Sequence, residues 1–312
     1  MDKMQKILIT TSSFDLELPE IKTLRESGYE VVLNPYGRRL TEAEIRELLT
    51  PDIVGLIAGL EPLTKAVIDA APHLRVISRC GIGMDNVDLA AAKAQGIQVF
   101  NTPDAPTKAV AELAMGLILD ALRGISAQDR KIRAGEWQRP MGGLLGARTL
   151  GLIGFGRIGR KVAEYAQAFG AEIIMHDPFA TDNPHYVAFD DLLAQADIIS
   201  LHIPYSKESH HLIDRKALAK MKRGSILVNT ARGGLVDEQA LAEALQSGHL
   251  AGASLDVYAQ EPYQGILTDI ENITLTAHVG SYAQEARTEQ EALAARNMLI
   301  GLQDEAGARI YG

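Results

Sequence analysis

Residues 149–178, TLGLIGFGRIGRKVAEYAQAFGAEIIMHDP, decide the fold class of this chain. They hold a short apolar run, a glycine-rich turn, a helix-like stretch and a second apolar run that ends at Asp177. Gly154, Gly156 and Gly159 form a G-x-G-x-x-G pattern between the first run and the helix-like stretch. A strand, a turn of this kind, a helix and a second strand are typical of a parallel sheet that binds a dinucleotide.

Each glycine has a separate physical role in such a turn. Gly154 permits the tight turn, Gly156 lets the backbone approach a pyrophosphate, and Gly159 lets the helix pack closely on the strand. A glycine motif alone would also fit a plain strand–helix turn. Asp177, however, stands about twenty residues further on, where an acid binds the ribose hydroxyls. Because this carboxylate would repel a 2′-phosphate, and residues 178–179 offer no arginine, the sequence predicts NAD rather than NADP.

Short apolar runs alternate with longer helix-like segments along the whole chain, which predicts an α/β fold with parallel sheets. The runs form two series: 7–10, 30–33, 53–58, 74–78 and 97–100, then 149–153, 172–176, 198–202, 225–229, 252–255 and 273–276. Long helix-like stretches at 106–123 and 283–303 flank the second series. We therefore expect two doubly wound domains. A Rossmann domain for NAD (102–282) is inserted into a flavodoxin-like substrate domain (1–101 and 283–312).

Composition excludes several classes of protein. The 312 residues carry a net charge of −9, which argues against nucleic acid or an anionic membrane as the main partner. No apolar run is long enough to span a bilayer, and the first ten residues lack a signal-peptide pattern. Cys80 is the only cysteine, so no intrachain disulfide can form, and a cytoplasmic location is expected. No metal site is expected.

Four ionisable side chains follow the strands of the second series. Arg232, Asp256 and His278 each come just after an apolar run, and Glu261 lies five residues beyond Asp256. Ligands of an open α/β sheet bind beyond the carboxyl ends of its strands. Each residue also has a structural alternative: an ion pair with Asp237 for the arginine, a buried structural role for the histidine, and a turn for the glutamate. Together, beside a dinucleotide turn, they predict an active site.

Their chemistry suits hydride transfer between a 2-hydroxy acid and NAD. The forked guanidinium of Arg232 can bind a substrate carboxylate through two hydrogen bonds. His278 can take the hydroxyl proton, because histidine titrates near neutral pH. A carboxylate beside the imidazole fixes its tautomer and favours its protonated form, a role that fits Glu261.

The sequence also resembles a known family over almost its whole length. The blocks GFGRIG, NTARGGLVDE, LDVYAQEP and LTAHVGSYAQEA resemble the signature blocks of the D-isomer-specific 2-hydroxyacid dehydrogenases. The blocks at 78–103 and 109–119 resemble the segments that link the two domains of that family. The resemblance implies an NAD-dependent oxidoreductase. It also implies a homodimer joined largely through its NAD domains.

Carried over residue by residue, the resemblance assigns the site. Arg232, Glu261 and His278 match the catalytic arginine, glutamate and histidine. Ile82 and Gly83 match the loop whose N–H groups hold the substrate carboxylate. The matching cofactor contacts are Gly154, Gly156, Arg157, Ile158, Gly159, Asp177, Pro204, Thr230, Ala231, Asp256 and Gly280. Ala277 stands where the family commonly has proline, which loosens the turn before the histidine.

The substrate side resembles phosphoglycerate dehydrogenases in part. The W-x-R spacing of residues 137–139 resembles a segment that contributes across the dimer, and it makes Arg139 a candidate substrate contact. Arg79 resembles a substrate-side arginine, with a core ion pair as the alternative. Ala58 stands where those enzymes often carry an arginine, which argues against phosphate. Arginines 38–39 could compensate, although a solvated turn is favoured.

The resemblance makes 3-phosphoglycerate the first-choice substrate, with serine biosynthesis as its setting. No regulatory C-terminal extension is expected, because the chain stops at Gly312. Within the class, the alternative is a reductase of glyoxylate, hydroxypyruvate or another 2-keto acid. From another class, a non-catalytic NAD-sensing protein is the alternative, since the family includes transcriptional corepressors.

Overall fold

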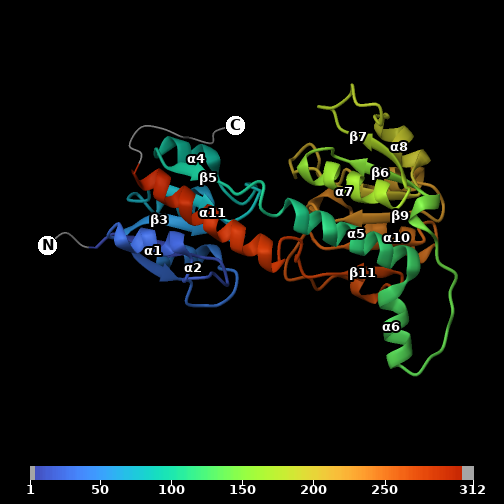
Figure 1. Cartoon of the computed structure of the whole chain (residues 1–312), viewed down its shortest axis with the longest axis horizontal. Coiled ribbons are helices and arrows are strands. Elements are labelled where there is room, and N and C mark those ends of the chain that lie inside the picture. The colour runs from blue at the N-terminus through green and yellow to red at the C-terminus, as the bar shows by residue number, and fades with distance from the viewer. Residues whose placement is uncertain (1–3, 304–312) are drawn as a thin grey trace. The chain divides into compact units, whose positions relative to one another are not determined.

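The computed structural model describes residues 4–303, which form two compact units (Figure 1). Unit 1 holds the described residues up to Pro106 and from Ala283 onward, and unit 2 is Thr107–Tyr282. The first boundary therefore lies at residue 106, where the sequence had suggested 101. The five extra residues belong to the segment that leads into the long helix at 107.

Unit 1 is built on a five-stranded parallel sheet. Its strands are β1 (Lys6–Ile9), β2 (Glu30–Leu33), β3 (Ile53–Ala58), β4 (Val76–Arg79) and β5 (Gln98–Phe100). Its helices are α1 (Pro19–Glu26), α2 (Glu42–Leu48), α3 (Lys65–Asp69), α4 (Leu89–Ala94) and α11 (Gln284–Gln303). The strand order β2-β1-β3-β4-β5 is that of a flavodoxin-like sheet.

Alternating side chains of each strand feed two separate cores in unit 1. Leu8 of β1 packs in the core under α2, α3 and α4, whereas Ile7 and Ile9 pack in the core under α1 and α11. Helix α11 lies very close to the sheet: a Cβ on Gly55 would stand 2.5 Å from the sulfur of Met298. The predicted return of the C-terminal helix to the first sheet is thus what the structure shows.

Unit 2 is built on a six-stranded parallel sheet in the order β11-β10-β9-β8-β6-β7. Its strands are β6 (Thr149–Ile153), β7 (Glu172–His176), β8 (Ile198–Leu201), β9 (Ile226–Asn229), β10 (Gly252–Leu255) and β11 (Ile273–Leu275). An isolated parallel bridge from Met175 to Tyr186 lies on the free side of β7. With this bridge as the remnant of a strand, the order becomes that of the Rossmann fold.

Helices cover both faces of the second sheet. They are α5 (Thr107–Arg123), α6 (Ile125–Arg133), α7 (Arg157–Ala168), α8 (Phe189–Gln195), α9 (Arg215–Lys220) and α10 (Glu238–Gln246), with short 3-10 turns η1 (Leu145–Ala147), η2 (Gly233–Leu235) and η3 (Ile266–Asp269). In β9, Ile226 and Val228 pack in the core with α5 and α7, and Leu227 packs in the core with α8, α9 and α10. Every apolar residue of this strand is therefore buried, which explains its uninterrupted apolar run.

The predicted fold class is confirmed, and each predicted strand is present within two residues of its expected bounds. All strands of unit 2 run parallel, so their carboxyl ends meet at one edge of the sheet. The connections diverge between β6 and β8, which marks the switch point where ligands of such sheets bind. The loops after residues 153, 176, 201, 229, 255 and 275 therefore meet at one place.

One part of unit 2 stands apart from its sheet. Helix α6 extends away from the other elements of the unit in Figure 1, and it has no buried residue. Asp120 anchors its start by accepting hydrogen bonds from the N–H of Ser126 (2.7 Å) and the hydroxyl of Thr274 (2.6 Å). Within residues 4–303, no helix combines the length and apolar character that crossing a membrane requires.

Candidate active site

The glycine turn has the shape that a pyrophosphate needs. Gly154 has a φ of +96°, and a Cβ there would stand 2.6 Å from the carbonyl oxygen of His202. A Cβ on Gly159 would stand 2.2 Å from the carbonyl oxygen of Gly154. Around Gly156, in contrast, the space within 4 Å is open, and this residue begins α7 without a side-chain cap. The first N–H groups of α7 can therefore bind phosphate oxygens.

Asp177 connects the end of β7 to this turn. Its Oδ2 accepts from the N–H of Phe155 at 2.8 Å, and its Oδ1 accepts from the N–H of Phe179 at 2.9 Å. The carboxylate is thus held beside the glycine turn, as the ribose role requires. A carboxylate oxygen has a second lone pair, so these bonds leave acceptor capacity for ribose hydroxyls.

A buried asparagine holds the turn that carries Arg232 after β9. Asn229 is fully buried; its side-chain oxygen accepts from the N–H of Ala231 (3.0 Å), and its amide donates to the carbonyl of Arg232 (2.9 Å). The hydroxyl of Thr230 is buried and has no partner among the described residues. A buried hydroxyl without a partner at the end of a strand is compatible with a hydrogen bond to a bound cofactor.

His278 and Glu261 lie in direct contact. The imidazole Nδ1 stands 2.9 Å from Oε2 and 3.1 Å from Oε1 of Glu261. The two side chains are one quarter and one fifth exposed, so this contact is partly shielded from water. The carboxylate therefore occupies Nδ1 and leaves Nε2 as the nitrogen that can exchange a proton with a substrate.

Asp256 holds the loop that carries His278. Its Oδ1 accepts from the hydroxyl of Thr276 (2.5 Å) and the N–H of Val279 (2.9 Å), and its Oδ2 accepts from the N–H of Gly280 (2.8 Å). Asp256 is 1% exposed. Its predicted contact with the cofactor stays a prediction, because the observed partners are all protein groups.

The remaining predicted cofactor contacts lie at the same edge of the sheet. Arg157 and Ile158 open α7, and Gly280 is buried against the Asp256 carboxylate. Pro204 is exposed after β8, and Ala231 is half-buried after β9. Their positions at strand ends are compatible with a dinucleotide laid across the sheet edge.

In unit 1, the loop after β4 carries the predicted carboxylate site. Among residues 4–303, the N–H groups of Ile82 and Gly83 donate to no protein acceptor, while Asn101 donates to the carbonyl of Ile82 at 2.9 Å. Two neighbouring N–H donors without an internal acceptor are what a carboxylate can use. The predicted role of this loop is therefore compatible with its geometry.

Arg79 and Cys80 precede this loop and are both buried. Arg79 is 4% exposed and donates to the carbonyl of Cys80, and a Cβ on Gly81 would collide with its guanidinium. This placement suits support of the loop from within, and a substrate contact by Arg79 stays a prediction. Burial raises the pKa of the Cys80 thiol to about 11. The thiol is therefore protonated at neutral pH and packs as a small apolar side chain.

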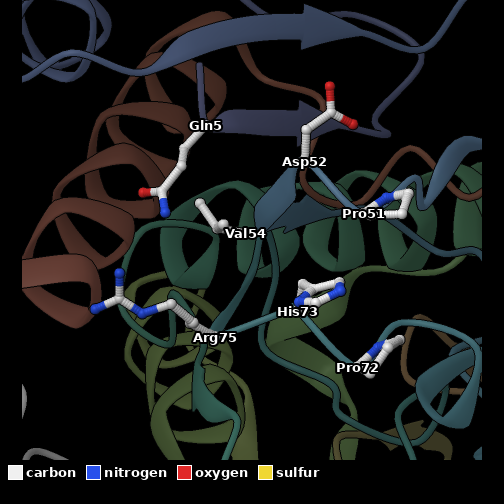
Figure 2. A pocket seen from close by; sticks show the side chains of 7 residues that line it. All are labelled: Gln5, Pro51, Asp52, Val54, Pro72, His73 and Arg75. Atoms are coloured by element: carbon white, nitrogen blue, oxygen red, sulfur yellow. The ribbon is translucent and has the colours of Figure 1, made fainter. Parts of the chain in front are cut away.

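An open hollow lies elsewhere in unit 1 (Figure 2). It is lined by Gln5, Pro51, Asp52, Val54, Pro72, His73 and Arg75, which lie at or just before the starts of β1, β3 and β4. Two of its polar side chains are engaged within the protein: Asp52 pairs with Lys6 at 3.3 Å, and Arg75 donates to the carbonyl of Leu302 at 3.1 Å. The hollow lies at the amino ends of the strands, so it is no candidate for the dinucleotide or its substrate.

Comparison with known proteins identifies the family. The family model described as "D-isomer specific 2-hydroxyacid dehydrogenase, NAD binding domain" matches residues 115–280. The hydroxypyruvate reductase of Thermotoga maritima is 42% identical over 260 residues, which are 80% of this chain and 85% of that protein. The D-3-phosphoglycerate dehydrogenase of Methanocaldococcus jannaschii is 39% identical over 97% of this chain, which spans 58% of that protein.

A solved structure agrees over nearly the whole chain. The TT0316 protein of Thermus thermophilus superimposes with a TM-score of 0.89 at 38% identity, covering 96% of this chain and 97% of that one. The fold and these relatives define an NAD-dependent oxidoreductase. The chain belongs to the D-isomer-specific 2-hydroxyacid dehydrogenase family.

Sequence reasoning missed the residues that hold the site in shape. Asn229 and Thr276 touch the loops of Arg232 and His278, yet neither residue was assigned a role. An asparagine just after a buried strand does favour a side-chain-to-backbone turn, so Asn229 could have been found from its type and place. Thr276 could not, because its partner lies 20 residues away.

The geometry at Asp177 predicts the choice of cofactor. The kcat/KM with NADH should exceed that with NADPH by about 10- to 100-fold, the worth of hydrogen bonds to a charged group. Asp177→Ala should narrow this ratio, whereas Asp182→Ala, which removes an exposed acid from the same segment, should leave it unchanged. Steady-state kinetics with both cofactors measures the ratio. Equal values for the unaltered protein would overturn the role of Asp177.

Proposed function

We propose that this chain interconverts a D-2-hydroxy acid and its 2-keto acid, and that its substrate is small and unphosphorylated, of the hydroxypyruvate or glyoxylate kind. The observation that supports this reaction is the contact of Glu261 with Nδ1 of His278. Both residues and the Arg232 turn lie at one edge of the sheet. We assign NAD binding to unit 2 and substrate binding to unit 1, following the boundaries of the compact units.

The proposed chemistry divides among three side chains. Arg232 binds the substrate carboxylate, and Nε2 of His278 donates a proton to the carbonyl oxygen in reduction or takes it back in oxidation. Glu261 holds Nδ1, so the imidazole keeps its orientation and its charged form is stabilised. NAD, when bound, supplies the hydride donor or acceptor. In unit 1, the N–H groups of Ile82 and Gly83 are proposed to bind a substrate carboxylate.

The charges of unit 1 favour an unphosphorylated substrate. Ala58 ends β3 where phosphate-binding members often carry an arginine, and Glu61, the one ionisable residue of the loop, accepts from the N–H of Gly59 at 3.0 Å. Arg38 pairs with Glu44 at 2.6 Å rather than remaining available. A phosphate dianion needs several cations or hydrogen-bond donors, and these loops have few that are available for it. The match to a hydroxypyruvate reductase over most of both chains also supports this choice.

Phosphoglycerate, the first choice from the sequence, is the second candidate here, with serine biosynthesis as its setting. The W-x-R segment at 137–139 favours it, since Arg139 is exposed and has no acidic partner among the described residues. The phosphoglycerate dehydrogenase of M. jannaschii matches nearly all of this chain. A cytoplasmic location also stays a prediction, drawn from composition alone.

His278→Ala tests the proton-transfer role. The rate of keto-acid reduction should fall about 10²- to 10⁴-fold, because a positioned acid is lost, while NADH affinity changes little. Rapid mixing for the rate and fluorescence titration for NADH separate the two effects. Activity within a factor of a few of the unaltered protein would mean that another group transfers the proton.

Glu261→Gln should move the pH profile rather than abolish activity. The amide keeps the size of the side chain but removes the charge that stabilises the imidazolium. The proton is therefore lost at lower pH, and the lower limb of the oxidation profile should shift to lower pH. The pH dependence of kcat/KM for oxidation checks this. Glu164→Gln, which changes an exposed acid on α7 of the same unit, is the control.

Arg139→Ala separates the two substrate candidates. For the phosphoglycerate hypothesis, the KM for phosphohydroxypyruvate should rise by the equivalent of about 1.5–3 kcal/mol, and the KM for hydroxypyruvate should not. For the proposed function, the unaltered protein turns over hydroxypyruvate or glyoxylate faster, and the substitution affects all substrates alike. A panel of 2-keto acids monitored by NADH absorbance gives both answers. No turnover of any keto acid would favour an NAD-sensing protein.

We also propose a homodimer formed through the arm that consists of α6 and residues 134–144. This arm and its flanks expose five large apolar side chains: Ile125 57%, Ile132 51%, Trp137 82%, Met141 99% and Leu144 71%. So large an apolar surface on one projecting segment is typical of a contact with another chain. A second copy of this chain fits, since the resemblance implies an interface in this unit.

Sedimentation equilibrium should give twice the chain mass of 33.7 kDa. Charged residues within the arm should weaken the dimer, because they would be buried unpaired at the interface, so Trp137→Glu with Met141→Glu should shift the mass toward one chain. Phe179→Glu, which changes an equally exposed aromatic residue outside the arm, should not. A monomer in the unaltered protein at micromolar concentration would contradict the proposal.

A further inference from the structure

Tyr258 touches the supports of three site residues at once. It follows β10 by three residues and is 9% exposed. Its backbone contacts Glu261 and the glycine beside Arg232, and its hydroxyl reaches the loop of His278. The backbone and side chain of Tyr258 together therefore connect the three loops that carry Arg232, Glu261 and His278.

The contact with the Glu261 turn has two parts. The N–H of Tyr258 donates to Oε1 of Glu261 at 3.2 Å. The ring of Tyr258 stacks on that of Tyr263, with centroids 4.3 Å apart and planes 21° apart. Glu261 lies between Tyr258 and Tyr263 in sequence, so the stacked rings hold the two ends of its turn together. The carboxylate is thereby kept where it meets the imidazole.

The contact with the His278 loop is made by the hydroxyl. It lies 2.7 Å from the carbonyl oxygen of Thr276 and 3.1 Å from that of Leu255. A hydroxyl has one proton, so the shorter contact receives it. The residue that accepts this bond is the one whose side chain donates to Asp256, two positions before His278.

The contact with the Arg232 turn is steric. A Cβ on Gly233 would stand 1.8 Å from the carbonyl carbon of Tyr258 and 2.1 Å from its oxygen. The turn after Arg232 therefore lies directly against the Tyr258 peptide. Movement of this peptide must move the arginine turn, since the gap leaves no room for adjustment.

We propose that Tyr258 is a positioning residue that fixes the distance between Glu261 and His278, and so sets the pH range in which His278 can act as acid and base. Its hydroxyl anchors the histidine loop and its peptide anchors the glutamate. The inference rests on the proposed roles of Glu261 and His278. It adds a residue that touches neither substrate nor cofactor in the proposed mechanism.

The anchor holds throughout the working pH range. Burial, followed by the nearby carboxylates of Asp256 and Glu261, raises the pKa of the Tyr258 hydroxyl well above its usual value. The hydroxyl therefore stays protonated and keeps donating at alkaline pH. The expected change in the pH profile of keto-acid reduction therefore originates at the histidine and not at the tyrosine.

Tyr258→Phe tests the inference because it removes the hydroxyl and keeps the stacked ring. The kcat for keto-acid reduction should fall about 3- to 10-fold, the equivalent of one hydrogen bond. The upper limb of the reduction profile should shift to lower pH, because a loosened histidine loop holds the imidazole less closely to the carboxylate, which then stabilises the imidazolium less. NADH affinity should be unchanged. Tyr165→Phe, a loss of one hydroxyl on α7, should alter neither kcat nor the profile.

The outcomes separate this inference from the proposed function. His278→Asn is measured beside the tyrosine variants: retained activity with an unaltered profile would overturn the roles on which the inference rests. If His278→Asn is inactive and Tyr258→Phe keeps the normal kcat and limb, the tyrosine does not position the pair. Should Tyr258→Phe fail to fold, 4-fluorophenylalanine at 258 fills the space of the hydroxyl without a donor. It should show the same shifted limb, and a normal limb would overturn the inference.

Discussion

The buried carboxylate of Asp256 is the constraint on which the site depends. It accepts hydrogen bonds from the N–H groups of Val279 and Gly280 and from the hydroxyl of Thr276. It therefore holds the chain on both sides of His278. The histidine has a φ of +54°, a conformation that costs a residue with a Cβ about 1–2 kcal/mol. Charge-assisted hydrogen bonds of this kind offset such a cost. The strained backbone then points the imidazole toward Glu261.

The parallel sheet makes this arrangement possible from distant parts of the chain. Arg232, Glu261 and His278 follow three adjacent strands, β9, β10 and β11, and their loops start from one edge. Because β9 packs apolar residues in both cores of unit 2, and β10 and β11 pack apolar residues in one of them, the loops begin from fixed points. A proton donor and a carboxylate-binding cation must be held within a fraction of an ångström of productive geometry, and rigid strand ends are suited to this.

The sequence predicted the strands and the glycine turn well, and the reason is physical. Strands buried on both faces give uninterrupted apolar runs such as 226–228, and glycine at 154 and 159 follows from steric contacts that allow no Cβ. Charged groups at strand ends are equally visible, because they are costly unless they bind something. The use of Asp256 was not visible, since its partners lie 20 to 24 residues away, and two of them are backbone groups. Helix α6 was not predicted either, because Ile125 and Ile132 are its only large apolar side chains.

The charge that unit 1 offers a substrate also depends on contacts that form only in the folded chain. In unit 1, Arg38 and Arg39 follow β2, and by sequence either could bind a phosphate. In the folded chain Arg38 is paired with Glu44, and Arg287 is paired with Glu291 across one helical turn at 2.5 Å. A cation that is already neutralised by a neighbouring carboxylate attracts an anion weakly, because a second anion must displace the first or accept a shared charge. Under the proposed function, Arg38 and Arg287 therefore add little attraction for a phosphate, although both are arginines of unit 1.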